Sequence, residues 1–341
     1  MRRRWLALVI GVVTVALPAT ATATADVSSI RIAGADRYGT AQAIATSTFT
    51  DVAVAVVATG ENYPDSLASG YLTGANQGPV LLTPTSGVPQ GVIDALNAVK
   101  AEGVQIVGGT SAVSAPAEAQ LKDAGFTVTR IAGVDRYGTA RAIANTLPAA
   151  GIGELGDAGR TAIIASGENF PDALAAGPLA HDGGFPLLLT PTATLSTETN
   201  AALDELAIEN VVIMGGTAAV SNEVALAIDA KGITVRRVAG ENRQATAAAI
   251  ADLVVDELDW PATHVQLARG DAFPDALAGG PHAGEERGPI LLTLSPEVLG
   301  APSENWLTAH ESTVSLIHVY GGTSAVTDAT MTAARQAAGG T

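Results

Sequence analysis

The sequence contains no cysteine, and this absence excludes disulfides, thiolate metal ligands, lipid-modified cysteines and thiol nucleophiles. It is also poor in cations, with 18 Lys and Arg residues against 34 Asp and Glu residues and a net charge of −16. Such a chain is a poor partner for nucleic acid and for anionic membrane surfaces. Hydrophobic residues make up 47% of its 341 positions, so burial of apolar cores can hold it together without cross-links.

Long apolar runs are missing after the first 25 residues. Residues 2–4 are arginines, residues 5–17 are apolar, and residues 23–25 read Ala-Thr-Ala. This order predicts a secretory signal peptide over residues 1–25, with Sec and twin-arginine export both open. We therefore expect a secreted chain that begins at Asp26, carries 15 basic and 34 acidic residues, and has no membrane contact once the signal is removed.

What the chain does contain is one block of fifteen residues written three times. The copies are RIAGADRYGTAQAIA at 31–45, RIAGVDRYGTARAIA at 130–144 and RVAGENRQATAAAIA at 237–251. Each copy is followed, in the same order, by a Gly-acid-x-aromatic-Pro-Asp motif, a short apolar run and a Gly-Gly-Thr motif. This repetition predicts three modules, each near the usual size of a domain. Their predicted bounds are 26–126, 127–233 and 234–341.

Helix and strand signals alternate within each module. After Asp36, apolar positions recur with the spacing of an amphipathic helix, and the residues at this position in the three blocks, Asp36, Asp135 and Asn242, are good N-caps. The short runs between helices are continuously apolar and β-branched, which is typical of strands buried on both faces of a parallel sheet. The alternation predicts an α/β fold of three tandem, doubly wound parallel-sheet modules with right-handed crossovers.

The two ends of the chain complement each other: a strand is predicted near the N-terminus, and the last module lacks one of its expected strands. A strand is expected after Gly125 and after Gly232, but no residues remain for one after Gly339. Residues 26–33 resemble such a strand and have no module before them. We predict that this N-terminal strand takes the vacant place beside the third module and closes the modules into a ring.

The Gly-acid-x-aromatic-Pro-Asp motif holds two carboxylates four residues apart in every module. They lie where an apolar strand ends and a helix begins. Three interpretations are open: an acid and a proline that favour the first turn of a helix, a contact to a ligand or Ca²⁺, or a catalytic pair of a glycosidase. The pairs are Glu61 and Asp65, Glu168 and Asp172, and Asp271 and Asp275.

The Gly-Gly-Thr motif is predicted to follow a strand and to lead into the last helix of its module. This helix is expected to start near Ser114, Ser221 or Thr327, which are again N-cap types, and to end near Gly125, Gly232 or Gly339. The backbone N–H groups of the motif could then hold an anion at the carboxyl edge of the sheet. The alternative is that its glycines only permit a tight turn. Neither the dinucleotide nor the nucleotide phosphate loop pattern occurs in the sequence. The candidate ligand-binding residues of this motif are Gly108, Gly109, Thr110, Gly215, Gly216, Thr217, Gly321, Gly322 and Thr323.

One arginine occupies the same place in all three repeated blocks. Arg37, Arg136 and Arg243 either pair with Asp65, Asp172 and Asp275 or with a neighbouring module, or present their forked donors to an anionic ligand.

Catalytic patterns are absent from the sequence. Its five histidines are scattered, with no zinc-protease motif, and no nucleophile elbow occurs. We predict a protein that is not an enzyme and that has no catalytic residues, no metal and no cofactor.

The repeated motifs together resemble the cell wall binding repeat 2 family. The resemblance covers residues 30–340 and implies Rossmann-like modules in a pseudo-threefold arrangement. It further implies a secreted bacterial protein of the cell surface and wall, held non-covalently by wall polysaccharide or another anionic secondary wall polymer. Relatives often carry an added effector domain, for which we find no room in this chain.

Two other functions stay open at this point. One is a wall-degrading glycosidase or other hydrolase that uses the carboxylate pairs, and the other is a surface-coat protein or adhesin. The third module also departs from the pattern, because Gln244 replaces Tyr38 and Tyr137. We therefore expect the three modules to bind unequally.

Overall fold

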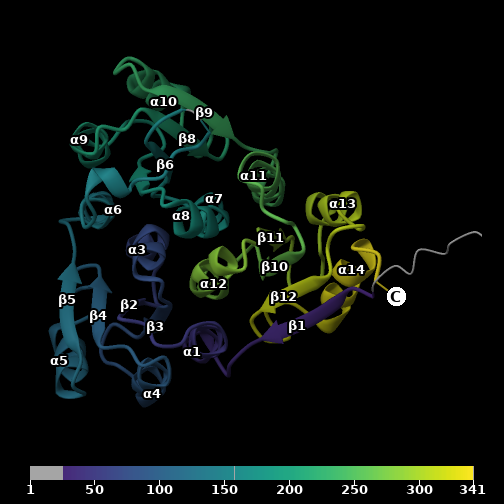
Figure 1. Ribbon diagram of the computed structural model, residues 1–341, viewed down its shortest axis with the longest axis horizontal. Coiled ribbons are helices and arrows are strands. Elements are labelled where there is room, and N and C mark those ends of the chain that lie inside the picture. Colours follow the sequence, from purple (N-terminus) through teal and green to yellow (C-terminus); the bar gives the residue numbers. More distant parts are fainter. Residues whose placement is uncertain (1–25, 157, 341) are drawn as a thin grey trace, which may run out of the picture.

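The computed structural model describes residues 26–156 and 158–340 of the chain. Three four-stranded parallel sheets stand around a common centre, with helices between and outside them (Figure 1). The predicted α/β class, with three tandem doubly wound modules in a pseudo-threefold arrangement, is confirmed. The predicted signal peptide, residues 1–25, lies outside the described residues. Within the described ranges, no helix is long and apolar enough to cross a membrane.

The first module contains one sheet with the strand order β3-β2-β4-β5. Its strands are buried on both faces, as the apolar runs predict; five of the six residues of the strand after the first helix are fully buried. The elements are α1 (Arg37–Thr48), β2 (Val54–Thr59), α2 (Pro64–Leu67), α3 (Ser69–Asn76), β3 (Val80–Thr83), α4 (Gln90–Ala98), β4 (Gly103–Val107), α5 (Ala115–Asp123) and β5 (Thr127–Ile131).

The second module repeats this plan with the strand order β7-β6-β8-β9. A short 3₁₀ turn, η1, lies before its first buried strand. The elements are α6 (Arg136–Ala144), η1 (Ala149–Gly151), β6 (Thr161–Ser166), α7 (Pro171–Ala175), α8 (Gly177–Gly183), β7 (Leu187–Thr190), α9 (Thr197–Glu205), β8 (Asn210–Met214), α10 (Asn222–Asp229) and β9 (Thr234–Val238).

The third module has the strand order β11-β10-β12-β1, so its fourth strand comes from the other end of the chain. The elements are β1 (Ser28–Ile32), α11 (Arg243–Glu257), β10 (His264–Arg269), α12 (Pro274–Glu285), β11 (Ile290–Thr293), α13 (Ala301–Ala309), β12 (Leu316–Tyr320) and α14 (Asp328–Ala337).

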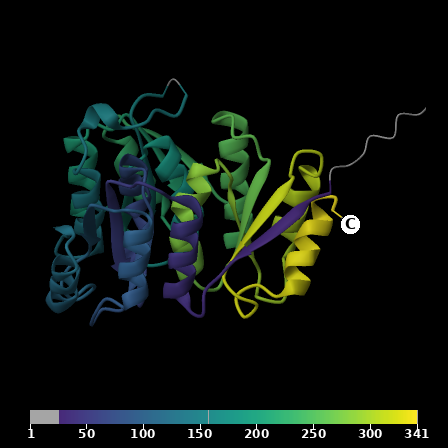
Figure 2. The same cartoon turned by 60° about the horizontal axis from the view of Figure 1, so that its bottom comes forward.

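Pairing of β1 with β12 closes the ring and confirms the predicted place of the N-terminal strand. The two strands run parallel, with Ser28 opposite Leu316 and Ile32 opposite Tyr320. Figure 2 shows β1 crossing from the first module to lie beside the last strand of the third. In the same way, β5 and β9 complete the sheets of modules 1 and 2. The repeat bounds after residues 126 and 233 stay predictions. The sheet of module 1 takes its fourth strand from residues after 126, and the sheet of module 2 takes its fourth strand from residues after 233.

The opening helix of each module begins as its sequence predicts. The Asp36 carboxylate accepts from the Gly39 N–H at 2.8 Å, and Asp135 accepts from the N–H groups of Tyr137 and Gly138. Asn242 does the same for Ala245 at 2.9 Å. These side chains satisfy donors that the first turn of a helix cannot pair internally.

Helices α3, α8 and α12, one from each module, pack together around the pseudo-threefold axis (Figure 1). Gly70 permits this approach, because a Cβ there would lie 2.7 Å from the Gly177 carbonyl oxygen. The buried His181 ties the three helices: its Nδ1 lies 3.0 Å from Thr73 Oγ1, and its Nε2 lies 3.0 Å from Glu285 Oε1. One hydrophobic core therefore runs through all three modules.

Candidate functional site

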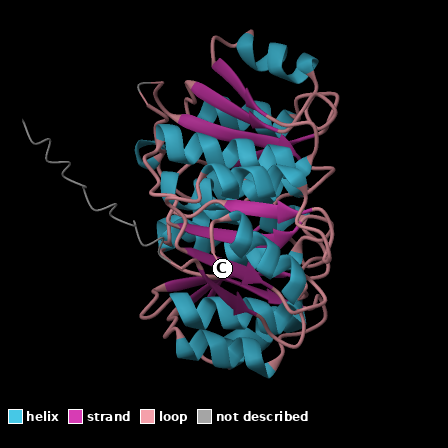
Figure 3. Ribbon diagram, turned by 90° about the vertical axis from the view of Figure 1, so that its right-hand side faces the viewer, coloured by secondary structure: helices cyan, strands magenta, loops and turns pink. Residues whose placement is uncertain are grey.

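The strands point toward one face of the molecule, where the loops that follow them gather (Figure 3). At this face, each module's Gly-acid-x-aromatic-Pro-Asp segment meets the opening motif of the next module around the ring. Ligands of open α/β sheets favour this carboxyl edge. The candidate site is therefore a set of junctions between modules, and no single module contains it.

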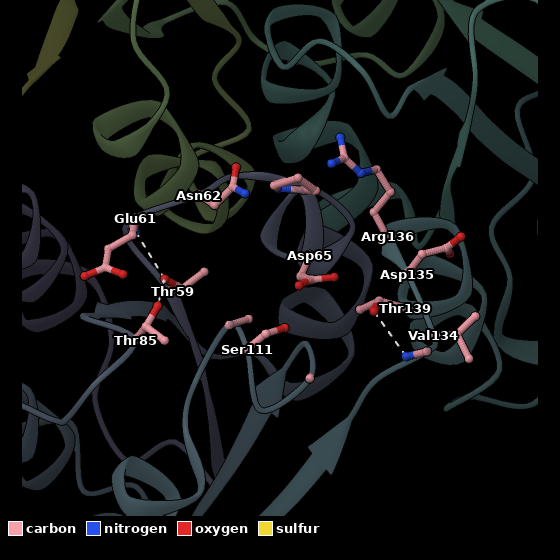
Figure 4. A pocket seen from close by; sticks show the side chains of 14 residues that line it. Thr59, Glu61, Asn62, Asp65, Thr85, Ser111, Val134, Asp135, Arg136 and Thr139 are labelled. Carbon is pink, nitrogen blue, oxygen red and sulfur yellow. Dashed lines mark hydrogen bonds between the residues drawn. The ribbon is translucent and has the colours of Figure 1, made fainter.

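One opening, here called cleft 1–2, lies between modules 1 and 2 and has a volume of about 500 Å³. Its lining is mostly hydroxyl, carboxyl and amide groups (Figure 4). Module 1 contributes Thr59, Glu61, Asn62, Pro64, Asp65, Thr85, Gly109, Ser111 and Ala112, and module 2 contributes Gly133, Val134, Asp135, Arg136 and Thr139.

At every junction, one carboxylate reaches across to a threonine hydroxyl of the following module. The pairs are Asp65–Thr139, Asp172–Thr246 and Asp275–Thr40. The same threonine oxygens accept from the N–H groups of Gly133, Gly240 and Gly34, at 3.1, 3.1 and 3.2 Å. Each threonine thus accepts from the opening motif of its own module and faces a carboxylate of the preceding one.

Burial raises the pKa of all three aspartates, Asp65, Asp172 and Asp275, and the threonine hydroxyl opposes this shift in each case. A charged carboxylate loses hydration when it is buried, so its protonated form is favoured. These aspartates therefore contact the module that follows their own around the ring, which none of the three interpretations of the motif predicted.

The first acids of the predicted pairs lie elsewhere. Glu61 is exposed and lies toward Thr59 and Thr85, whereas Asp65 lies toward Thr139 and Asp135 (Figure 4). Glu168 accepts from the Thr192 hydroxyl at 2.7 Å, and Asp271 pairs with Arg269 at 2.7 Å. The spacing of four residues therefore puts the two acids of a motif in different surroundings.

Arg37, Arg136 and Arg243 bind a backbone carbonyl and also face the preceding module. Arg37 donates to the Gly60 carbonyl at 2.5 Å, Arg243 donates to Gly270 at 2.6 Å, and Arg136 makes the equivalent bond to Gly167. Their charges lower the pKa of Asp275, Asp172 and Asp65 without overcoming the effect of burial. The remaining donors of the exposed Arg37 and Arg243 point to no described protein acceptor.

The Gly-Gly-Thr motif forms a turn of its own, and the helix that follows it begins at the predicted cap, several residues beyond the glycines. Helix α5 begins only at Ala115, capped by Ser114 Oγ. The turn closes on itself instead, with the N–H groups of Ala112 and Val113 donating to Gly109. Without a helix N-terminus, the sequence argument for an anion site at Gly108, Gly215 and Gly321 loses its main support.

The first glycine of this turn is required by the neighbouring aspartate. Gly108 has a φ of +96°, and a Cβ there would lie 2.6 Å from Asp65 Oδ2. Gly215 and Gly321 stand in the same relation to Asp172 and Asp275. Gly109 lines cleft 1–2, and Gly322 lines a similar opening between modules 3 and 1. Thr110, Thr217 and Thr323 are exposed beside the turns, outside the linings of both openings.

A second opening, here called cleft 3–1, lies between modules 3 and 1 and has a volume of about 220 Å³. Arg269 lines it at the position that Thr59 occupies in module 1, and Ala272 replaces Asn62. The guanidinium of Arg269 binds both carboxylate oxygens of Asp271, at 2.7 and 2.8 Å. A long cation therefore stands where cleft 1–2 has a short hydroxyl.

Two sets of residues at this face were not singled out from the sequence. One is the first arginine of each repeated block: Arg31, Arg130 and Arg237 donate to the carbonyls of Gly321, Gly108 and Gly215, at 2.9, 2.7 and 2.8 Å. The other is the aromatic residue of each Gly-acid-x-aromatic-Pro-Asp motif, and these three rings meet at the axis. Both sets recur once in every module, and this repetition is the sequence signal that could have identified them.

Comparison with known proteins agrees with this arrangement of modules. The model of the cell wall binding domain 2 family matches residues 31–118, 130–225 and 237–331. The chain belongs to this family. Each matched cell wall binding domain begins at the arginine that opens a repeated block, which confirms the three tandem repeats.

Solved structures with the same fold include two proteins of Clostridium difficile, Cwp6 and Cwp8. Cwp6 superposes with a TM-score of 0.79 at 24% identity, over 90% of this chain and 48% of that one. Cwp8 superposes with a TM-score of 0.78 at 24% identity, over 92% of this chain and 52% of that one. The three-module fold of this chain therefore occurs in solved structures as well.

Two curated relatives come from Bacillus subtilis. The N-acetylmuramoyl-L-alanine amidase LytC is 31% identical over 272 residues, which is 80% of this chain and 51% of that protein. A protein named amidase enhancer is 28% identical over 271 residues, again 80% of this chain but 35% of that protein. The chain thus spans about half or less of the relatives it matches.

Proposed function

We propose that this protein is a secreted, non-catalytic cell-wall-binding protein that attaches non-covalently to an anionic secondary wall polymer through the junctions between its modules. The observation that carries the proposal is the threefold repetition of one polar junction on a single face of a chain made of cell wall binding domains. Three weak contacts to one polymer can add up to tight retention.

The charge of the chain requires that the contact be local. A strongly acidic protein is repelled by a polyanion at long range. Arg37, Arg136 and Arg243 supply forked donors at the three junctions, and such donors suit carboxylate and phosphate groups. We therefore expect wall retention that withstands moderate salt.

Sedimentation with purified bacterial walls tests the proposal. The wild type should sediment with the walls, and replacing all three arginines by Gln should weaken retention by about tenfold or more. A variant in which Lys100, Lys122 and Arg160 become Gln removes the same charge from exposed sites elsewhere and should bind as the wild type does. A folded wild type that stays in solution with every wall preparation would refute the proposal.

The hydrolase alternative has its own readout. Both curated relatives carry names linked to an amidase, so wall degradation is the competing activity to test. The turbidity of a wall suspension should stay constant when the protein is added. A fall in turbidity that disappears with Asp65→Asn would favour the hydrolase.

A further inference from the structure

The aromatic residues of the three Gly-acid-x-aromatic-Pro-Asp motifs form a cluster on the pseudo-threefold axis, here called the axial triad: Tyr63, Phe170 and Phe273. Their ring centroids lie 5.4, 5.6 and 6.0 Å apart, and each ring is tilted or edge-on to the others. Aromatic residues are scarce in this chain, at 4% of its positions, and yet three of them meet here with side chains that are only partly buried. The triad therefore presents apolar ring surface at the same face as the clefts.

Cations surround the triad. The Arg37 guanidinium lies 5.8 Å from the Phe273 ring centroid, and the Arg243 guanidinium lies 5.6 Å from that of Phe170. Both stand over a ring of the preceding module, at distances typical of cation–π contacts. The arginines are thereby fixed at the edge of an apolar surface, with donors left for a group bound on it.

Tyr63 connects the triad to cleft 1–2. It lies between Asn62 and Pro64, which both line this cleft, and its hydroxyl donates to the Glu168 carbonyl of module 2 at 2.8 Å. The phenol is thus held across the junction, so its ring has one orientation beside the cleft and outside its lining.

The lining of cleft 1–2 does not suit a polyanion. Glu61, Asp65 and Asp135 stand against the single cation Arg136. Hydroxyls from Thr59, Thr85 and Ser111 complete the polar surface. Carboxylates only accept hydrogen bonds, so they favour a ligand that brings O–H or N–H donors and no negative charge.

We propose that the axial triad and cleft 1–2 together bind neighbouring uncharged, hydroxyl-bearing sugar rings of the wall polymer. The C–H face of one ring packs on Tyr63, and hydroxyls of the next ring donate to Glu61 and to the carboxylate of Asp135. The anionic groups of the polymer lie outside the cleft, within reach of Arg37 and Arg243. This division explains how an acidic protein recognises an anionic polymer, and it rests on the proposed function.

The matched variants Tyr63→Ala and Tyr63→Phe test the inference on walls boiled in detergent and treated with protease, so that only polysaccharide and peptidoglycan remain. Tyr63→Phe keeps the ring and copies Phe170 and Phe273 but loses the bond to the Glu168 carbonyl, so its binding should fall by only about threefold. Tyr63→Ala should bind about tenfold more weakly, because the stacking surface is gone. Tyr63→Leu fills the space without a flat face and should show the same loss even if the Ala variant unfolds.

Equal binding of the Leu and Phe variants to these walls would overturn the inference while leaving wall binding itself intact. A defect seen only on walls that still carry protein would also overturn it, because the triad would then dock a protein partner. Failure of the wild type to bind any wall would refute the proposed function along with the inference.

Discussion

Cleft 1–2 and cleft 3–1 follow one plan and differ in what fills them. In both clefts, an aspartate of one module lies beside a threonine hydroxyl of the next module, and an arginine lies near this pair. Cleft 1–2 encloses about 500 Å³ and cleft 3–1 about 220 Å³. The lining of cleft 3–1 includes Arg269 and that of cleft 1–2 the short Thr59. A repeated architecture thus keeps the contact between modules while single side chains change the volume and charge of the opening.

The two clefts also differ in how the chain builds them. Modules 1 and 2 are consecutive, so the peptide itself joins the two walls of cleft 1–2. Cleft 3–1 unites the last module with the first, and its walls meet because β1 pairs with β12. Closure of this cleft therefore depends on a strand more than two hundred residues away from its sheet.

Deletion of residues 26–33 should have the largest effect, because cleft 3–1 should then no longer form while cleft 1–2 remains. It removes the fourth strand of the third sheet and the Arg31 bond to Gly321, and it exposes the edge of β12. We expect a loss of several kcal/mol in the free energy of unfolding, since a whole strand pairing and its buried surface disappear. Hydrogen exchange should show faster amide exchange in β12 and β10 as well as in α1. Loosening confined to α1 would contradict closure of the ring.

Gly108→Ala should cost about 1–3 kcal/mol in the free energy of unfolding, because the residue has a positive φ and its new methyl group meets Asp65. The matched control is Gly109→Ala, where the nearest atom of a Cβ is Ser111 Oγ at 3.9 Å. Urea unfolding at neutral pH measures both variants. A similar cost for the two would show that the contact between the turn and Asp65 does not support the junction.

Asp172→Asn should change how stability depends on pH. Burial raises the pKa of Asp172 in the folded state, so the extra stability of the wild type over the variant is fully present below the unfolded pKa and is lost as pH rises through the folded value. The difference in unfolding free energy, wild type minus variant, should fall from about pH 3.5 to about pH 7 in urea unfolding experiments. A difference that rises over this range would mean that Arg243 and the Thr246 hydroxyl outweigh burial.

Arg269→Thr should have the smallest effect on stability, and it tests directly whether this one side chain makes cleft 3–1 smaller than cleft 1–2. It gives module 3 the residue of module 1 and removes a partly exposed ion pair with Asp271, so the free energy of unfolding should change by less than about 1 kcal/mol. Cleft 3–1 should open toward the size of cleft 1–2 and gain affinity for wall polymer, measured as higher retention on walls. Unchanged retention would show that Arg269 does not limit this cleft.

Much of the fold followed from local patterns in the sequence. The caps at Asp36, Asp135 and Asn242 and the short buried strands are set by neighbours within a few residues. Closure by residues 26–33 was also predictable, because three modules supplied only three candidates for the fourth strand. The helix caps at Ser114, Ser221 and Thr327 were predictable as well. The glycines before them were expected at the helix N-terminus but form a separate turn, since glycines after a strand suit both.

The candidate site was less predictable than the fold. The sequence marked Asp65, Asp172 and Asp275, but their partners Thr139, Thr246 and Thr40 belong to the next module around the ring. It marked the three arginines without indicating that each binds a strand-end carbonyl. It gave the aromatic residue of each motif no role. These contacts join residues that are far apart in the sequence, so the periodicity of a single helix or strand could not predict them.

The sequence by itself determined that one α/β unit is present three times, where its helices and strands begin, and that a strand at the start of the chain lacks a module of its own. Helical and strand periods carry this information, because burial on one or both faces of an element constrains residues only a few positions apart. Only the tertiary structure decided that the polar groups meet between modules, that the clefts are unequal, and that three aromatic rings share the axis. Those outcomes depend on how sheets and helices from distant segments pack, and packing selects partners by shape and by position in space.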